Sequence, residues 1–541
     1  MEGEREQARL IEPSHDSAST VEVLSAAQLM SHLLLYYQRP EPATWVFLSS
    51  FLLLSIYFVF HRFFCIRNLD ILLLLLLAPG LMMVYEGRRM QLAHTSGVVS
   101  DGLASVSRDS YPPTSDLKAG TFKAGTFKAG TSKAAGESET STRLIANMQA
   151  VADGPASGVA NEANGTTENK GYPAVPKSPR ISATSLEFYG FIALLFACLL
   201  LMIRMLVDPA LVRRPLLIPN LSIGGLSFIG VSLFLFLMAN VITSSPLEQR
   251  ERGPELGPGY ALLNMLPELP TMPDDVPHGA VDSSPIEGEH WLPNIARILA
   301  ILSNLAIVFG IVGVGYWHFD NVKTGIGCAV MYLLLPYTAQ MTGNLEHIAP
   351  AALMVLALLA YRQPVLAGML LGLAAGLVYY PLFLLPLWIS FYWHRGLKRL
   401  LGGVVGSLLL LSGLLLLEGA EAFGDHLRSM YGLWLPRMDG LVGVWGPGRF
   451  QADFRRPVLV AFILLSVSFV FWPPRKNLGT LICGTGAVML AAQFWHGNGG
   501  GLFMAWFLPF VMLTIFRPNL DDRVATQVVR GRSPVPAAPT T

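Results

Sequence analysis

Residues 292–317 read LPNIARILAILSNLAIVFGIVGVGYW, a run of 26 residues in which Arg297 is the one charged side chain. An α-helix rises about 1.5 Å per residue, and the hydrocarbon core of a bilayer is about 30 Å thick. About 20 apolar residues are therefore enough to cross it as a helix. This stretch predicts a membrane-spanning helix, and the rest of the chain can be read outward from it.

The composition of the whole chain agrees with a membrane location. The protein has 541 residues, of which 52% are hydrophobic and 14% are charged. Soluble domains carry about 25% charged residues, so this chain lacks the polar surface of a soluble protein. The 38 Lys and Arg residues against 37 Asp and Glu leave a net charge of +1. Without a basic excess, we expect no nucleic-acid partner.

Twelve further apolar runs bring the expected number of membrane segments to about 13. They are residues 44–60, 68–85, 186–206, 221–243, 324–339, 348–361, 365–379, 380–393, 400–417, 457–472, 478–494 and 502–516. Backbone inside a bilayer must satisfy its own hydrogen bonds, which favours helices. We therefore predict an all-α polytopic membrane protein with about 13 transmembrane or re-entrant helices and long external loops.

Lys and Arg residues concentrate in alternate short loops, and such loops are typically cytoplasmic. The basic set comprises Arg62 and Arg67, Arg204 to Arg214, Lys323, Arg362, Arg395 to Arg399, Arg475 and Lys476, and the tail from Arg517. Loops 340–347 and 496–501 contain neither Lys nor Arg and are expected outside. Arg88 and Arg89 conflict with this orientation, because it places them outside. We expect Arg204 and Arg297, near helix ends, to extend their long side chains to the interface.

The expected organisation alternates membrane segments with polar ones. In order, we predict a polar N-terminal segment (1–43), a transmembrane hairpin (44–85), a disordered low-complexity insert (86–185) and a second hairpin (186–243). These are followed by an acidic, Pro-rich external loop (244–291), a bundle with a re-entrant hairpin (292–417), an external interfacial loop (418–456), membrane helices (457–516) and a cytoplasmic tail (517–541). The re-entrant hairpin should turn near Tyr379-Tyr380-Pro381, because proline ends a helix and disfavours helix before it.

The sequence lacks the motifs of soluble enzymes. It contains no P-loop, no G-x-G-x-x-G after a strand, no H-E-x-x-H and no G-x-S-x-G. The four cysteines, Cys65, Cys198, Cys328 and Cys483, are far apart in apolar stretches and are expected to be small hydrophobic residues. We predict no metal site and no cofactor.

Residues 342–399 read TGNLEHIAPAALMVLALLAYRQPVLAGMLLGLAAGLVYYPLFLLPLWISFYWHRGLKR. The pattern of Gly343-Asn344, Arg362, Gly368 with Gly372, and Tyr380-Pro381 resembles the core of GT-C-type polytopic glycosyltransferases, particularly mannosyltransferase-like membrane proteins. The resemblance covers about a tenth of the chain and consists mostly of small and apolar residues. Gly368 and Gly372 also form a small-x-x-x-small pair, which tightly packed membrane helices use generally.

The resemblance implies transfer of a sugar from a lipid-phosphate donor to an external acceptor. The chain departs from the family at two places. Leu377-Val378-Tyr379 stands where such families often carry a lysine, and the insert 86–185 offers no equivalent of their catalytic aspartate in the first external loop. The transfer would need a carboxylate that accepts the acceptor's proton and cations that hold the phosphate.

Glu346 and His347 are the candidate catalytic residues, because they lie at the outer mouth of the helix that carries the resemblance. The alternative for Glu346 is an acid favoured by the positive end of a helix dipole. Two further acidic groups lie outside the predicted helices and can be explained in the same way or as solvated faces. They are Glu287, Glu289 and His290, and Glu418, Glu421, Asp425 and His426.

Arg428, Arg437 and Arg449 are the candidate residues for binding the donor phosphate. With Arg455, Arg456, Trp434 and Trp445 they form a basic and aromatic stretch that could cradle a phosphate or anchor the loop at the membrane interface. The stretch His496-Gly-Asn-Gly-Gly-Gly501 predicts either an anion-binding nest or a tight turn between two helices.

Two functions from different classes follow. The first is a membrane glycosyltransferase of GT-C-like architecture that acts on the external face with a polyprenyl-phosphate sugar. The second is a non-enzymatic polytopic scaffold or envelope protein whose loops bind partners. In either case we expect the lipid bilayer as surroundings and the bacterial inner membrane as location.

Overall fold

The computed structural model describes residues 41–91, 182–211, 217–244, 246, 259–271, 291–417, 423, 441–521 and 523–528. These residues are overwhelmingly helical, and their one strand pair is the antiparallel β1 (Arg523–Val524) with β2 (Gln527–Val528). The expected all-α class is therefore confirmed. The N-terminal segment 1–43 and the insert 86–185 lie almost wholly outside the described residues.

Six of the described helices are long and apolar enough to cross a membrane. They are Ile66–Gln91, which begins with α3 (Ile66–Leu75), Ala183–Ala210, which contains α6 (Ala183–Val207), α7 (Ile223–Ile242), α9 (Leu292–Trp317), α15 (Leu397–Leu416) and α18 (Leu478–Trp495). Several such helices in one chain are the mark of an integral membrane protein.

The expectation of about 13 spans is not confirmed, because the remaining apolar runs form shorter helices. These are α2 (Pro42–Tyr57), α10 (Val322–Leu334), α12 (Leu345–Leu359), α13 (Pro364–Leu377), α14 (Leu385–Tyr392), α17 (Arg455–Ser468) and α19 (Leu508–Phe516). Apolar content alone does not show where a helix ends. The run 324–339, for example, is interrupted at Leu335, after which Pro336 starts the short helix α11 (Pro336–Gln340).

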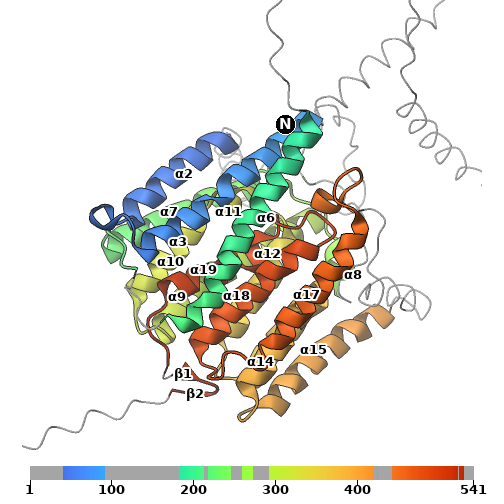
Figure 1. Ribbon diagram of the computed structural model, residues 1–541. Helices are drawn as coiled ribbons and strands as arrows, with labels where there is room; N and C mark the ends of the chain where they lie inside the picture. Colours follow the sequence, from blue (N-terminus) through green and yellow to red (C-terminus); the bar gives the residue numbers. More distant parts are fainter. Residues whose placement is uncertain are drawn as a thin grey trace, which may run out of the picture. The chain divides into compact units, whose positions relative to one another are not determined.

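Two helices form the centre of the packed core. α18 packs between α6 and α17, as Figure 1 shows, and it also contacts α19. Every residue of α19 is buried, and so are nearly all residues of α18. A helix that is apolar on all sides is stable only when it is surrounded by other helices.

A second series of helices runs through α7, α10, α9, α12, α13 and α15, each in contact with the next. The closest contact joins α13 to α15 through glycines. A Cβ atom added to Gly368 would lie 2.1 Å from the carbonyl oxygen of Leu400, and one added to Gly372 would lie 2.7 Å from that of Val404. The small residues in the GT-C-like stretch therefore have a packing role in this protein.

The predicted break between α13 and α14 is present. α13 ends at Leu377, and a 3-10 turn, η3 (Tyr380–Leu384), leads into α14. Gly396, which follows α14 with a φ of +96°, lies against Pro364 at the start of α13. The chain therefore returns to the level at which α13 began, which is the geometry of a hairpin.

The C-terminal residues 517–528 join several of the basic loops at one end of the bundle, here called the Arg517 end. Arg517 binds Asp208, Asn477 donates to Asp521, and Arg523 forms an ion pair with Asp320. Asp208 follows α6, Asn477 precedes α18 and Asp320 follows α9. Three of the loops that carry predicted cytoplasmic Lys and Arg residues thus share one end with the C-terminal residues.

Candidate functional site

Glu346 and His347 lie in the first turn of α12, and both side chains are buried. A hydrogen bond of 2.7 Å joins Tyr337 Oη to His347 Nδ1, and His347 Nε2 lies 3.5 Å from Glu346 Oε1. When the phenol donates to Nδ1, the ring proton is on Nε2, on the side of the Glu346 carboxylate. The indole of Trp506 donates to the backbone oxygen of Glu346 at 3.2 Å. Neighbouring helices therefore fix this turn on two sides.

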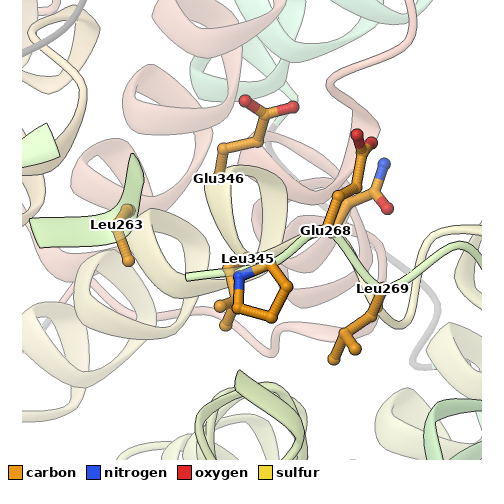
Figure 2. A pocket seen from close by; sticks show the side chains of 8 residues that line it. Leu263, Glu268, Leu269, Leu345 and Glu346 are labelled. Carbon is orange, nitrogen blue, oxygen red and sulfur yellow. The ribbon is translucent and has the colours of Figure 1, made fainter. Parts of the chain in front are cut away.

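Glu346 shares a narrow cavity with a second carboxylate, that of Glu268. Figure 2 shows both carboxylates projecting toward the same side, with Leu263 and Leu269 directed elsewhere. The cavity measures about 20 Å³, which is room for one water molecule or one hydroxyl group. We call this end of the bundle the Glu346 end.

The segment that carries Glu268 is held tightly against the turn before α12. Thr271 donates from Oγ1 to the backbone oxygen of Gln340 at 2.5 Å, and the N–H of Gly343 donates to the same hydroxyl at 3.4 Å. A Cβ atom at Gly343 would lie only 2.2 Å from the oxygen of Leu269, so this approach requires glycine. Sequence reasoning treated Glu268 as one acid of an irregular loop. Its apolar neighbours, in Leu266-Pro-Glu-Leu-Pro270, were the available signal that it packs on the bundle.

An aromatic stack connects Glu346 and His347 to the loop 496–501. The ring of Phe503 lies 4.2 Å from that of His347 and 4.1 Å from that of His496, and His496 stacks on Tyr380 at 4.8 Å. Burial lowers the pKa of His496, and the positive charge of Arg455 and the proximity of His347 lower it further. His496 is therefore neutral near pH 7, with Nδ1 accepting from the N–H of Asn498.

The glycines of the loop 496–501 form a tight turn. Gly499 and Gly501 have positive φ angles of +77° and +100°. The N–H of Gly501 donates to the side chain of Gln493, and that of Gly499 donates to the oxygen of Val442. Because these N–H groups are occupied within the protein, the turn interpretation is the one that the geometry favours over the anion nest.

Of the predicted phosphate-binding residues, Arg449 lies within the described residues, and its guanidinium has a carboxylate partner. Arg449 Nη2 lies 2.5 Å from Glu187 Oε2, and Arg88 Nε lies 3.1 Å from Glu187 Oε1. This pairing gives Arg88 a carboxylate partner at the Glu346 end, while the conflict of Arg88 and Arg89 with the alternation of basic loops remains. Arg428 and Arg437 lie outside the described residues, and phosphate binding by all three arginines stays a prediction.

Two other arginines of that stretch are described. Arg455 is fully buried, donates from Nε to the oxygen of Trp495 at 2.7 Å, and has its guanidinium carbon 5.4 Å from the Trp495 ring centroid. It lies beside His496 and so belongs to the neighbourhood of Glu346. Arg456 is exposed and lies 3.6 Å from Asp453. Trp445 is buried, and its indole donates to the backbone oxygen of Phe494 at 3.0 Å. The other acidic and aromatic candidates fall outside the described residues: Glu287, Glu289, His290, Glu418, Glu421, Asp425, His426 and Trp434.

A group of buried charges at the Arg517 end was not foreseen. Arg204 does not extend to the interface: it binds Asp70 through two nitrogens and Asp208 through a third, at 3.0 Å. Arg517 binds the other oxygen of Asp208. Arg297, the other arginine expected to extend to the interface, is not part of this group and donates to the backbone oxygen of Ser244 at 2.9 Å. The group pairs two acids with two arginines, as charged side chains buried in membrane proteins usually are.

No protein-family model matches the chain, and no curated protein or solved structure shows significant similarity to it. Within the described ranges, no group of three or more His, Cys, Asp and Glu side chains is arranged to hold a metal ion. A functional interpretation therefore depends on the geometry of the Glu346 end.

Proposed function

We propose that the protein is an integral membrane glycosyltransferase of GT-C-like architecture that transfers a sugar from a lipid-phosphate donor in the bacterial inner membrane. The observation that carries the proposal is the shared cavity of Glu346 and Glu268, with His347 at 3.5 Å from Glu346. Glu346 is the general base in this scheme. The reaction takes place at the Glu346 end, on the external face.

In the proposed step, the acceptor hydroxyl oxygen attacks the anomeric carbon while Glu346 takes the hydroxyl proton. The bond from the anomeric carbon to the lipid phosphate breaks, and the phosphate leaves with the electron pair. A cavity of about 20 Å³ fits the reacting hydroxyl group, so the sugar itself lies outside it. His347, held by Tyr337, orients the Glu346 carboxylate.

The leaving phosphate requires positive charge nearby. Arg455, beside His496, is the buried arginine of the described part of the loop. Arg428, Arg437 and Arg449 belong to the same loop and are proposed to contribute, although Arg449 would share its charge with Glu187. No metal or cofactor is part of this scheme.

The proposal is tested with purified protein in lipid nanodiscs and a panel of radiolabelled polyprenyl-phosphate sugars. Glu346→Gln should lower the transfer rate by about 10²–10⁴-fold, the usual contribution of a general base. The matched control is Glu86→Gln, which neutralises a half-buried acid paired with the exposed Arg89 at 3.4 Å. Equal rates in both variants would remove Glu346 from the site. No transfer by the wild type with any lipid-linked donor would favour the non-enzymatic scaffold.

A further inference from the structure

A second cavity, much larger than that of Glu346, opens at the Arg517 end between α2 and α3. It measures about 440 Å³ and is lined by Phe58, Val59, Phe60, His61, Cys65, Arg67 and Asn220. This volume lies within the range of small-molecule sites, which is about 300–1,000 Å³. We call it the Arg67 cavity. The apolar helix Ile66–Gln91 separates it from the Glu187 cluster, where Arg88 lies.

The walls of the Arg67 cavity are fixed by hydrogen bonds. The side chain of Asn68 donates to the backbone oxygens of Val59 at 2.9 Å and Phe63 at 3.1 Å, and it accepts from the N–H of Val59. On the opposite wall, the N–H of Asn220 donates to the oxygen of Ile56 at 3.0 Å. The cavity is therefore formed before any ligand enters, which reduces the entropic cost of binding.

The cavity has a positive charge, that of Arg67, which is not neutralised by any acid in the described part of the chain. Arg67 donates from Nη2 to the backbone oxygen of Ile218 at 2.7 Å, but it makes no ion pair with any acid among the described residues. Its Nε–H is buried and has no acceptor within the same residues. His61 adds a second basic side chain to the lining. An arginine presented in this way favours a phosphate group, which its planar fork of donors fits.

The rim of the cavity is apolar and exposed. Phe60, Phe63 and Phe64 all expose their rings, and Phe64 is fully exposed. Phenylalanine partitions favourably into the hydrocarbon core of a bilayer, so exposed rings of this kind beside a membrane-spanning helix suit contact with acyl chains. A ligand that combines a phosphate group with an apolar tail matches both parts of this surface.

We propose that the Arg67 cavity binds the phosphate group of an anionic membrane phospholipid, with Arg67 donating to the phosphate and the acyl chains lying along Phe60 and Phe64. This site is independent of the proposed transferase activity, because it uses none of the residues of the Glu346 end. Its test therefore needs no enzyme assay.

The first test counts bound lipids by native mass spectrometry after detergent-solubilised protein is mixed with phosphatidylglycerol or phosphatidylcholine. The wild type should retain more phosphatidylglycerol than phosphatidylcholine. Arg67→Gln, which keeps a donor for Ile218 but removes the charge, should bind phosphatidylglycerol about tenfold or more weakly. Arg475→Gln, which neutralises an exposed arginine between α17 and α18, is the control and should bind as the wild type does. Equal retention in both variants would overturn the proposal.

The second test uses the wild-type protein and its own cysteine. Cys65 lines the cavity and is partly exposed, whereas Cys198, Cys328 and Cys483 are buried. Phosphatidylglycerol should slow the reaction of Cys65 with a maleimide several-fold, and phosphatidylcholine should not. Equal protection by inorganic phosphate alone would show a free-phosphate site and overturn the assignment to lipid. Equal protection by the two lipids, or none by either, would overturn it as well.

Discussion

Arg204 and Asp70 form a two-pronged ion pair across 134 residues of sequence, with Nε to Oδ1 at 2.6 Å and Nη2 to Oδ2 at 2.9 Å. Asp208, on the helical turn after Arg204, joins the same group and is fully buried. The pair fixes the beginning of the helix Ile66–Gln91 against the end of α6. Through Arg517, the group also holds the C-terminal residues.

Removing one acid from this group should destabilise the protein strongly. Asp70→Asn keeps the shape of the side chain but leaves Arg204 with one carboxylate partner, and breaking a buried ion pair costs about 3–5 kcal/mol. Thermal unfolding in detergent should show a clear drop in Tm. The control is Glu86→Gln, in a largely solvent-accessible pair worth at most about 1 kcal/mol. Equal Tm values for the two variants would contradict a structural role for the group.

Two adjacent glycines of α15 should respond in opposite ways to the same substitution. A Cβ atom at Gly403 would lie 2.3 Å from the oxygen of Val365, whereas no described residue has an atom within 4 Å of one at Gly402. Gly403→Ala should therefore force α13 and α15 apart and cost about 1–3 kcal/mol. Gly402→Ala should stabilise by up to about 1 kcal/mol, because alanine is the better helix former.

The measurement is the Tm of both variants in the same detergent. A stabilised Gly403→Ala would mean that α13 and α15 do not approach as closely as the structure has them. A destabilised Gly402→Ala would mean that this face of α15 is covered in the intact protein.

Acid should destabilise the protein through His318, which follows α9 and bonds to the oxygen of Leu359 at 2.8 Å. Burial lowers the pKa of His318 to about 4, and the charges of Arg362 and Arg523 act in the same direction. The folded state therefore resists protonation. The neutral His318 makes its full contribution to the free energy of unfolding above pH 6.5, which is about the pKa of histidine in the unfolded chain. This contribution is lost as the pH falls toward 4, by up to about 3 kcal/mol.

The check is the Tm of the wild type and of His318→Gln between pH 7.5 and pH 5. Because the amide does not titrate, the variant should lose less stability over this interval. His394→Gln, at an exposed position, should follow the wild type. Parallel curves for wild type and His318→Gln would assign the acid sensitivity elsewhere, and His496 would be the next candidate.

The sequence predicted where helices form better than how long they are or what they touch. Every apolar run contains a helix, and the break before Pro381 follows from the chemistry of proline. The pairing of Asp70 with Arg204 could not be predicted, because it depends on how two distant helices are placed. For the same reason Glu268 was missed: its approach to Glu346 depends on the glycine at position 343, whose partner is a backbone atom far along the chain.

Glu268 offers a test of the candidate site that sequence reasoning would not have suggested. In the proposed reaction, both Glu268 and Glu346 face the acceptor hydroxyl. Glu268→Gln should lower the rate of sugar transfer, and less than Glu346→Gln does, because it removes a neighbouring charge and not the base itself. The Glu268→Gln and Glu346→Gln double variant should be about as slow as Glu346→Gln alone. The rate losses caused by substituting residues that act as one unit in catalysis are not additive.

The four proteins of this cycle are compared by transfer rate in nanodiscs, with Tm measured on each to exclude unfolding. Additive effects would separate the two carboxylates and leave the cavity as a packing feature. Slower transfer in Glu268→Gln than in Glu346→Gln would reverse their roles and make Glu268 the base. In that case Glu346 would position the acceptor from the start of α12, and His347 would hold the Glu346 carboxylate in place through their 3.5 Å contact.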